Sequence, residues 1–340
     1  MEDLQGLYSL DGKSLGKGTF GDVQLAIELK TDKKVAAKKI PKKILNDQKQ
    51  LNLINNEILI STTTLSNEKY LLKTLDLTEI EGEKYMICEY CNGGDLYNYL
   101  HKYKKKYNRF YDEKTVKFIL TQVLQGLQSL HQNKITHHDI KPSNILLSFE
   151  NDSDRDNFNI LNKCTAKIAD FGLSNYQDNG EKSIRGSPLY LDPNLFDKDV
   201  KLETIESNKV DIWSIGIMTY ELLFGKTPFE NKSRNREEGM KELIDNLKSG
   251  MYILDLSKGQ KYSKQFLCFL DCCLQTNQKI RKDCIELNFS EFISRDYKYF
   301  EFIDITNFKE KIPNEYISFD ERGIMMNSND ELKLCYFLGM

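Results

Sequence analysis

The sequence predicts an α+β protein in which a small β-rich lobe precedes a larger, mainly helical lobe. Short runs of apolar and β-branched residues, separated by glycines and by a Thr31-Asp32 turn, dominate the first part of the chain and are typical of strands. Later in the chain, apolar residues recur at three- and four-residue steps, which is the period of an amphipathic helix. The pattern changes at residues 89–94, so we place the junction between the lobes there.

Strand-like runs and one helical pattern make up the predicted small lobe. The strand-like runs cover residues 7–15, 23–29, 35–40, 71–77 and 85–90. A helical pattern at residues 44–59 lies between the third and the fourth of these runs.

Amphipathic and buried helical patterns predict the larger lobe. Apolar residues at helical spacing predict a helix over residues 116–130, with Asp112 as its N-cap. Residues 210–224 are apolar on nearly every side, which predicts a buried helix. Residues 148–164 are rich in Asn, Asp and Ser and predict a solvated loop, whereas pattern alone assigns no role to residues 295–340. Further helices are predicted at residues 236–247, 263–274 and 283–292.

Composition and charge exclude several classes of protein. The 340-residue chain is long enough for two domains or two lobes. A formal net charge of −3 creates no overall attraction to nucleic acid or anionic membranes, so no nucleic-acid partner is expected. We expect neither a transmembrane segment, which needs about 20 apolar residues, nor a signal peptide. Eight scattered cysteines fit a reducing compartment, so we expect a cytoplasmic or nuclear protein.

A glycine-rich segment in the small lobe is the first candidate phosphate site. Gly16-Lys17-Gly18-Thr19-Phe20-Gly21 matches GxGxxG, a pattern shared by phosphate-binding loops and by ordinary turn-rich hairpins. A dinucleotide-binding motif needs a helix directly after its glycines. Here the strand-like residues 23–27 follow instead, which favours a β-hairpin whose backbone N–H groups approach phosphates without an intervening Cβ.

A lysine and a glutamate are candidates for charge partners beside the phosphates. Lys38 ends the apolar run Val35-Ala36-Ala37, so part of its strand is buried and its ammonium can contact the α- and β-phosphates. Such a lysine needs a carboxylate to hold it, and Glu57 in the helical pattern that follows is the best candidate. Each residue has an ordinary alternative, because a lone lysine or glutamate is more often a solvated charge.

The most informative region is His137-His138-Asp139-Ile140-Lys141-Pro142-Ser143-Asn144. Asp139 can accept the proton of a substrate hydroxyl, Lys141 can neutralise charge on a transferring phosphoryl group, and Asn144 can offer an oxygen to Mg²⁺. A later strand ends in Asp170-Phe171-Gly172, where Asp170 can join Mg²⁺ to the β- and γ-phosphates. Together these residues supply the base, the cations and the oxygen ligands that phosphoryl transfer requires.

Each of these motifs alone has an ordinary interpretation. Asp-Phe-Gly can be a simple turn, and His137 is better explained as a packed core residue than as a metal ligand. The occurrence of all the motifs in one order, on the expected strands and loops, favours phosphoryl transfer over chance.

These motifs make the chain similar to the eukaryotic protein kinase domain. In addition, the segment Gly186 to Asn194 resembles the family's substrate-binding segment, residues 211–216 resemble its central helix, and Arg281 matches its late arginine. The resemblance implies a bilobal protein-kinase-like fold with a five-stranded antiparallel N-lobe, one N-lobe helix and a mainly helical C-lobe. The implied boundaries are a domain at 8–294, with the N-lobe at about 8–88, the hinge at 89–94 and the C-lobe at about 95–294, and a tail at 295–340.

The resemblance also implies an activity and a set of site residues. ATP and Mg²⁺ would be bound, and the γ-phosphoryl group would pass to Ser or Thr of protein substrates, because the Lys-Pro-Ser-Asn form of the loop is similar to serine/threonine kinases. The catalytic residues would be Asp139, Lys141, Lys38, Glu57 and Ser187, and the metal ligands would be Asn144 and Asp170. The nucleotide would contact Gly16, Lys17, Gly18, Gly21, Val23, Ala36, Lys38, Glu89, Cys91, Asp95, Asn144, Leu146 and Asp170.

Within the family, the chain is most similar to the autophagy-initiating ULK group. The likeness rests on the hinge sequence at residues 89–96, on the Gly-Ser-Pro-Leu-Tyr run at residues 186–190, and on the long insert before Asp170. Members of that group usually carry C-terminal partner-binding domains, for which residues 295–340 are too short, so the likeness does not extend to an autophagy role. As a separate expectation, a regulatory partner would bind through this tail.

Two departures from the family pattern concern the activation segment. His138 stands where the family commonly has an arginine that pairs with a phosphate, for which Ser183 is the candidate here. A neutral imidazole holds phosphate less well than a guanidinium, so we expect activity to depend little on Ser183, which Ser183→Ala would test. Asn194 replaces the glutamate that usually pairs with Arg281; either Asn194 itself accepts a hydrogen bond there, or Asp192 or Asp197 is the substitute.

Two further departures lie in the small lobe. Ser61 stands where the family usually has an apolar residue, which we expect to weaken the active position of the Glu57 helix. Cys88 occupies the gatekeeper position by resemblance and is smaller than the usual residue. An active kinase and a nucleotide-binding pseudokinase or scaffold with little turnover both remain open. Retention of the set Lys38, Glu57, Asp139, Asn144 and Asp170 favours the enzyme.

Overall fold

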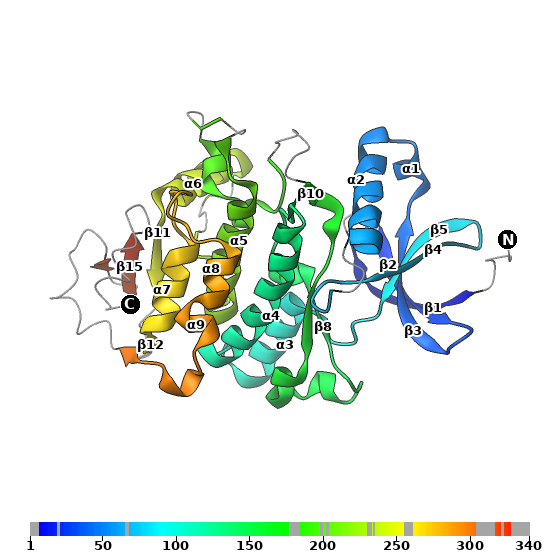
Figure 1. The fold of residues 1–340 in the computed structure, drawn as a ribbon, viewed down its shortest axis with the longest axis horizontal. Helices are drawn as coiled ribbons and strands as arrows, with labels where there is room; N and C mark the ends of the chain where they lie inside the picture. The colour runs from blue at the N-terminus through cyan, green and yellow to red at the C-terminus, as the bar shows by residue number, and fades with distance from the viewer. Residues whose placement is uncertain are drawn as a thin grey trace. The chain divides into compact units, whose positions relative to one another are not determined.

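Figure 1 shows the fold of the chain in a computed structural model. The chain forms two compact units, one of Met1–His101, Gln125–His137 and Ser143–Tyr176, and one of Lys102–Leu124, His138–Pro142 and Gln177–Met340. The predicted lobe boundaries stay predictions. The structure describes residues 7–18, 21–64, 68–176, 184–197, 200–201, 204–229, 233, 235–254, 261–303, 317–320 and 323–327.

The first unit contains the predicted five-stranded antiparallel sheet. Its strands are β1 (Tyr8–Lys17), β2 (Asp22–Glu28), β3 (Lys33–Ile40), β4 (Thr74–Ile80) and β5 (Glu83–Glu89), in the order β1-β2-β3-β5-β4. The fourth strand begins later than the predicted run at 71–77. The reason is a contact distant in sequence, because the Leu72 N–H donates to Ile168 O and the Ile168 N–H donates to Tyr70 O, both at 2.8 Å.

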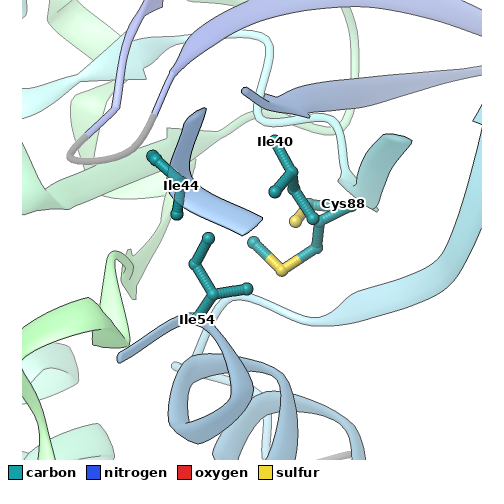
Figure 2. Packing of buried hydrophobic residues seen from close by; sticks show 5 residues of the cluster. Ile40, Ile44, Ile54 and Cys88 are labelled. Atoms are coloured by element: carbon teal, nitrogen blue, oxygen red, sulfur yellow. The ribbon is translucent and has the colours of Figure 1, made fainter. Parts of the chain in front are cut away.

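Strand alternation divides the core of this sheet between its two faces. Val35 and Ala37 of β3 pack with Ala26, Tyr85 and Ile87 on one face. On the other face, a second cluster joins the sheet to the helices, and Figure 2 shows its members Ile40, Ile44, Ile54 and Cys88 facing a common core. This second face is the one that also carries Ala36 and Lys38.

The helix predicted over residues 44–59 is two helices, α1 (Lys42–Leu45) and α2 (Gln48–Leu59). Asp47 ends the continuity because its side chain accepts hydrogen bonds from the N–H groups of Lys49 and Gln50, as an N-cap does. A single π-helical turn, Ile60–Thr64, follows α2. In Figure 1 both helices lie beside the strands of the five-stranded sheet.

A smaller sheet in the first unit carries the motifs around Asn144 and Asp170. It consists of β6 (Gly94–Asp95), β8 (Ile145–Ser148) and β9 (Thr165–Ile168), and β7 (Ile135–Thr136) pairs separately with β10 (Asn175–Tyr176). The solvated loop predicted at 148–164 is wrong in part. Phe149 and Leu161 are buried, and the segment forms 3₁₀ turns at Asp154–Asp156 and Phe158–Lys163.

The helices α3 (Leu96–Tyr107) and α4 (Glu113–Gln132) each have residues in both units. The second contains the predicted 116–130 helix. Asp112 acts as the predicted N-cap, because its Oδ1 accepts from the Thr115 N–H at 2.8 Å. No helix in the part of the chain that the structure describes combines the length and the apolar character needed to span a membrane.

The second unit is mainly helical. The helix predicted over 210–224 is α5 (Ser207–Phe224), buried along nearly its whole length. The helix predicted over 283–292 divides at Ser290, whose backbone leaves the helical conformation. The remaining helices are α6 (Arg236–Ser249), α7 (Lys264–Cys273), α8 (Cys284–Phe289) and α9 (Glu291–Ser294).

Parts of the C-terminal tail add strands to the second unit. β13 (Phe302–Ile303) pairs with β12 (Tyr262–Ser263), and β15 (Gly323–Asn327) lies between β11 (Met251–Leu254) and β14 (Ile317–Asp320). The described tail residues therefore pair through backbone hydrogen bonds with strands of the unit that contains Asp139 and Lys141, which the sequence pattern did not predict.

A buried acid on α7 makes stability depend on pH. Burial raises the pKa of Asp271 to about 7, although Gln275 Nε2 donates to its Oδ1 at 3.0 Å. The folded state therefore holds a proton that the unfolded state, with an ordinary aspartate pKa near 4, has released. This contribution to stability is complete below about pH 4 and is lost as the pH rises toward 7.

We expect Asp271→Asn to remove that loss. Between pH 5 and pH 8, the wild type should lose about 3 kcal/mol of unfolding free energy that the variant keeps. Urea unfolding at the two pH values measures both changes. Buried Glu113, whose pKa burial also raises to about 7, contributes equally to both proteins, so the difference isolates Asp271. Identical pH dependence in the two proteins would contradict the prediction.

Candidate functional site

The glycine-rich loop joins β1 to β2 in the first unit. Its Gly18 N–H donates to Gly21 O at 2.9 Å, while Thr19 and Phe20 lie outside the described residues. Gly16 has a φ of 153°, which residues with a side chain rarely adopt. A Cβ on Gly21 would lie 2.2 Å from the carbonyl oxygen of Lys39, so the loop approaches β3 too closely for any other residue.

Lys38, Glu57 and Asp170 meet in the first unit. Lys38 Nζ lies 2.7 Å from Glu57 Oε1 and 3.3 Å from Asp170 Oδ1, and Lys38 and Glu57 are both buried. Burial disfavours the ammonium, but the nearby carboxylates outweigh it and hold the pKa of Lys38 above its usual range. The lysine is therefore charged, and the predicted partner Glu57 is the residue that holds it.

The predicted metal ligands lie on neighbouring segments of the same unit. Asp170 follows β9 in the left-handed conformation, with φ 66° and ψ 71°. Asn144 is buried before β8, and its backbone oxygen accepts from the Ala169 N–H at 2.8 Å. A carboxylate and a carboxamide are hard oxygen donors of the kind that Mg²⁺ prefers, so this donor set fits the implied ion.

The helix that carries Glu57 is fixed by polar contacts on both sides. Asn56 Nδ2 donates to the backbone oxygen of Ser174, just after the Asp-Phe-Gly motif. Ser61 is buried, donates to Glu57 O at 2.7 Å and accepts from Thr74 Oγ1 at 2.8 Å. Ser61 thus finds a polar partner where an apolar contact is usual. Sequence reasoning missed Thr74, because nothing local marks a strand threonine as that partner.

The predicted adenine-contact residues come from the two sheets and the segment between them. Ala36 of β3 pairs with Leu25 and with Cys88, and Val23 pairs with Lys38. Glu89 is the last residue of β5, and Cys91 lies two residues after it. Leu146 lies in β8 opposite Asp95 of β6.

The structure gives two of these residues further contacts. Asp95 accepts hydrogen bonds from the backbone N–H of Asn98 at 2.8 Å and from its Nδ2 at 2.7 Å, so it also fixes the first turn of α3. Glu89 Oε1 accepts from the Lys73 N–H at 2.8 Å and pairs with Lys167 at 2.9 Å. The roles of these residues toward a nucleotide stay predictions.

Cys88 at the gatekeeper position carries a prediction about inhibitors. The side chain is buried beside Met86, and its Sγ lies 3.8 Å from Thr74 Oγ1. Because cysteine is shorter than methionine, we expect a bulky pyrazolopyrimidine to inhibit the wild type at least about tenfold more strongly than Cys88→Met. Inhibition curves measured at each protein's own ATP KM test this, and equal inhibition would refute it.

In the second unit, Asp139, Lys141 and Ser187 form a closed hydrogen-bonded set. Lys141 Nζ donates to Asp139 Oδ2 and to Ser187 Oγ, each at 2.7 Å. Asp139 Oδ1 accepts from the Ser187 N–H at 2.9 Å and from Ser187 Oγ at 2.8 Å. The structure thus brings together the predicted base, the predicted lysine and the predicted serine of the activation segment.

The backbone around this set is tightly determined. His138 has a φ of 67°, and its N–H donates to Asp211 Oδ1 at 2.8 Å, which holds this uncommon conformation in place. A Cβ on Gly186 would lie 2.3 Å from the carbonyl oxygen of His138, so only glycine allows this approach. Ser183, the predicted phosphosite, lies outside the described residues.

His137 is a core residue, in agreement with the prediction. It is fully buried, its Nε2 lies 3.1 Å from Ala169 O, and its ring meets that of Phe171 edge-on at 5.6 Å. These contacts belong to the first unit and support the residues next to Asp170.

Arg281 pairs with Asp192, one of the two predicted substitutes for the usual glutamate. Both side chains are fully buried. Asn194 contributes differently, because its Nδ2 donates to Asp192 Oδ1 and to Thr276 O, each at 2.7 Å. The departure at Asn194 is therefore compensated by moving the charge two residues earlier in the chain.

Comparison with known proteins yields one family. The family model described as "Protein kinase domain" matches residues 10–293. The chain is 34% identical over 225 residues to "Probable serine/threonine-protein kinase MARK-C" of Dictyostelium discoideum, covering 66% of this chain and 26% of the relative. It is 34% identical over 236 residues to "Serine/threonine-protein kinase ULK3" of Rattus norvegicus, covering 67% and 45%.

A third relative is "Serine/threonine-protein kinase ATG1b" of Arabidopsis thaliana, 33% identical over 225 residues, covering 66% of this chain and 28% of the relative. The predicted likeness to the ULK group is thus confirmed, and the MARK-C match is of similar strength. The chain spans only 26% to 45% of the length of these three relatives. Because the family model covers well over half of the chain, the protein belongs to the protein kinase domain family.

Proposed function

We propose that the chain is an active serine/threonine protein kinase that transfers the γ-phosphoryl group of ATP to hydroxyl groups of protein substrates. The observation that carries the proposal is the hydrogen-bonded set of Asp139, Lys141 and Ser187. Retention of this set together with the other groups that phosphoryl transfer requires favours an enzyme over a pseudokinase. The names of the relatives also favour serine and threonine over tyrosine.

Each group has a task in this proposal. Asp139 orients the attacking hydroxyl and accepts its proton, and Lys141 offsets negative charge on the phosphoryl group as it is transferred. Lys38, kept charged by Glu57, contacts the α- and β-phosphates. Asn144 and Asp170 would hold Mg²⁺, which supplies positive charge to the triphosphate when bound.

A labelling experiment with the full chain tests the proposal. The purified protein is incubated with γ-labelled ATP, MgCl₂ and separate peptide libraries that offer Ser, Thr or Tyr as the only acceptor. We expect label on the Ser and Thr libraries and none on the Tyr library. A protein that binds no nucleotide in the presence of divalent metal and labels no library would sink the proposal.

The cellular location of the protein and a regulatory partner are further proposals. We place the protein in the cytoplasm because its eight cysteines are scattered along the chain without the pattern of a disulfide scaffold, and imaging of a tagged chain would test this. We also propose that the C-terminal tail receives a regulatory partner, in competition with its own strands β13 and β15. If a candidate partner binds a chain truncated after residue 294 as well as it binds the full chain, the tail is not its site.

A further inference from the structure

The insert between β8 and β9 makes a contact set that the proposed mechanism does not use. Asp152 in this insert forms an ion pair with Lys34 of β3, with Nζ and Oδ2 2.7 Å apart. The other carboxylate oxygen accepts from Asn92 Nδ2 at 2.9 Å. One carboxylate therefore connects a strand of the five-stranded sheet, the hinge segment and the insert, all within the first unit.

Asn92 fixes the hinge side of this arrangement. Its Nδ2 also donates to the backbone oxygen of Phe149 at 3.1 Å, and its Oδ1 accepts from the Phe149 N–H at 2.8 Å. The amide thus pairs with both backbone groups of one residue, as a strand neighbour would. These two hydrogen bonds hold the start of the insert against the hinge and place Asp152 within reach of Lys34.

The position of Lys34 links these contacts to the nucleotide residues. Side chains alternate along a strand, so Lys34 lies on the same face of β3 as Ala36 and Lys38. Val35, between them, pairs with Glu89 at the end of β5, where the hinge begins. The Lys34–Asp152 pair therefore ties the nucleotide-facing strand to the segment that is proposed to contact adenine.

We propose that Lys34, Asn92 and Asp152 form a latch that holds β3 against the hinge and slows the release of nucleotide. This inference rests on the proposed function and names positioning residues, because none of the three touches reacting atoms. Lys34 and Asp152 are each about half exposed, with 49% and 51% of the side chain accessible. Exposed pairs of this kind are weak, so the latch opens readily and changes a rate by up to about fivefold.

Stopped-flow release of a fluorescent ADP analogue from the full chain tests the latch. Asp152→Asn and Lys34→Gln should each release ADP about two- to fivefold faster than the wild type. The double variant should be no faster than either single variant, because both remove the same contact. About 1 M salt should reduce the difference between wild type and variants, since the pair is exposed.

Matched variants control for charge alone. Asp156→Asn changes an acid in the same insert whose partner is its neighbour Arg155, and Lys33→Gln changes a lysine on the opposite face of β3. Both should release ADP at the wild-type rate. Hydrogen exchange of the Phe149 amide in the protein without nucleotide gives a second readout, and it should be faster in Asp152→Asn.

The outcomes separate the latch from the proposed function. A wild type that binds the ADP analogue and releases it at the same rate as Asp152→Asn, with unchanged exchange at Phe149, overturns the latch alone. A wild type that binds no nucleotide overturns the proposed function, and the effect on release with it. This contact set could not be predicted, because Lys34 and Asp152 are far apart in the chain and the composition of the insert indicated a solvated loop.

Discussion

Asp139→Asn should reduce the rate of phosphoryl transfer by on the order of 10²–10⁴, with little change in nucleotide affinity. The substitution keeps the shape of the side chain but removes its negative charge and its capacity to take a proton. In the wild type, Asp139 Oδ2 accepts from Lys141 and Oδ1 accepts from Ser187. An amide would direct an N–H toward one of these donors, so the variant loses the orientation of the set as well as the base.

Nucleotide affinity should remain because the predicted nucleotide contacts are other residues. They lie in the first unit, whereas Asp139 lies in the second. Single-turnover transfer of labelled phosphate measures the rate, and titration with a fluorescent ATP analogue measures affinity. A loss of 10²–10⁴ in rate corresponds to about 3–5 kcal/mol in the barrier, which these assays resolve easily.

A matched acid controls for the loss of one charge in the same unit. Asp245→Asn changes an exposed aspartate on α6 and should leave both rate and affinity at wild-type values. If Asp139→Asn kept the wild-type rate, the carboxylate would not be the base. If the wild type itself bound ATP but transferred no phosphate, the pseudokinase alternative would replace the proposed function.

Partners of buried charges could be predicted from the sequence better than the bounds of helices and strands. Lys38 and Glu57 could be paired in advance because a charged lysine on a buried strand demands a carboxylate, and the structure joins them. The same reasoning found Asp192 as a candidate for Arg281. In each case, a buried charge limits the number of acceptable partners, so the sequence pattern reduces the candidates to a few.

Contacts between distant exposed or neutral groups could not be predicted in this way. The Ser61–Thr74 hydrogen bond and the latch at Asp152 each join residues that carry no local signal of their partner. The break at Asp47 was readable in principle, because an aspartate directly before a helical run is a common N-cap. The prediction failed there because the apolar period continues across the break.

Asp192→Ala should destabilise the folded protein by about 3–5 kcal/mol, the largest effect on stability that we expect from a single substitution. The change leaves the guanidinium of Arg281 buried without its carboxylate, and it also removes the acceptor of Gln278 Nε2, which donates to Asp192 at 2.7 Å. Despite full burial, the contacts with Arg281 hold the pKa of Asp192 below its usual range. Its contribution is therefore present above about pH 4 and is lost as the pH falls below that.

Urea unfolding at pH 7 measures the effect through Trp213, which is the single tryptophan of the chain and has its ring 5.1 Å from the Arg281 guanidinium. Arg295→Ala is the control, because it breaks an exposed pair with Glu291 and should cost at most about 1 kcal/mol. Replacing both partners, as in Asp192→Leu with Arg281→Met, should cost less than Asp192→Ala alone, because no charge is left buried. If the single and double variants were equally unstable, the loss would come from packing around Asp192 rather than from the uncompensated charge.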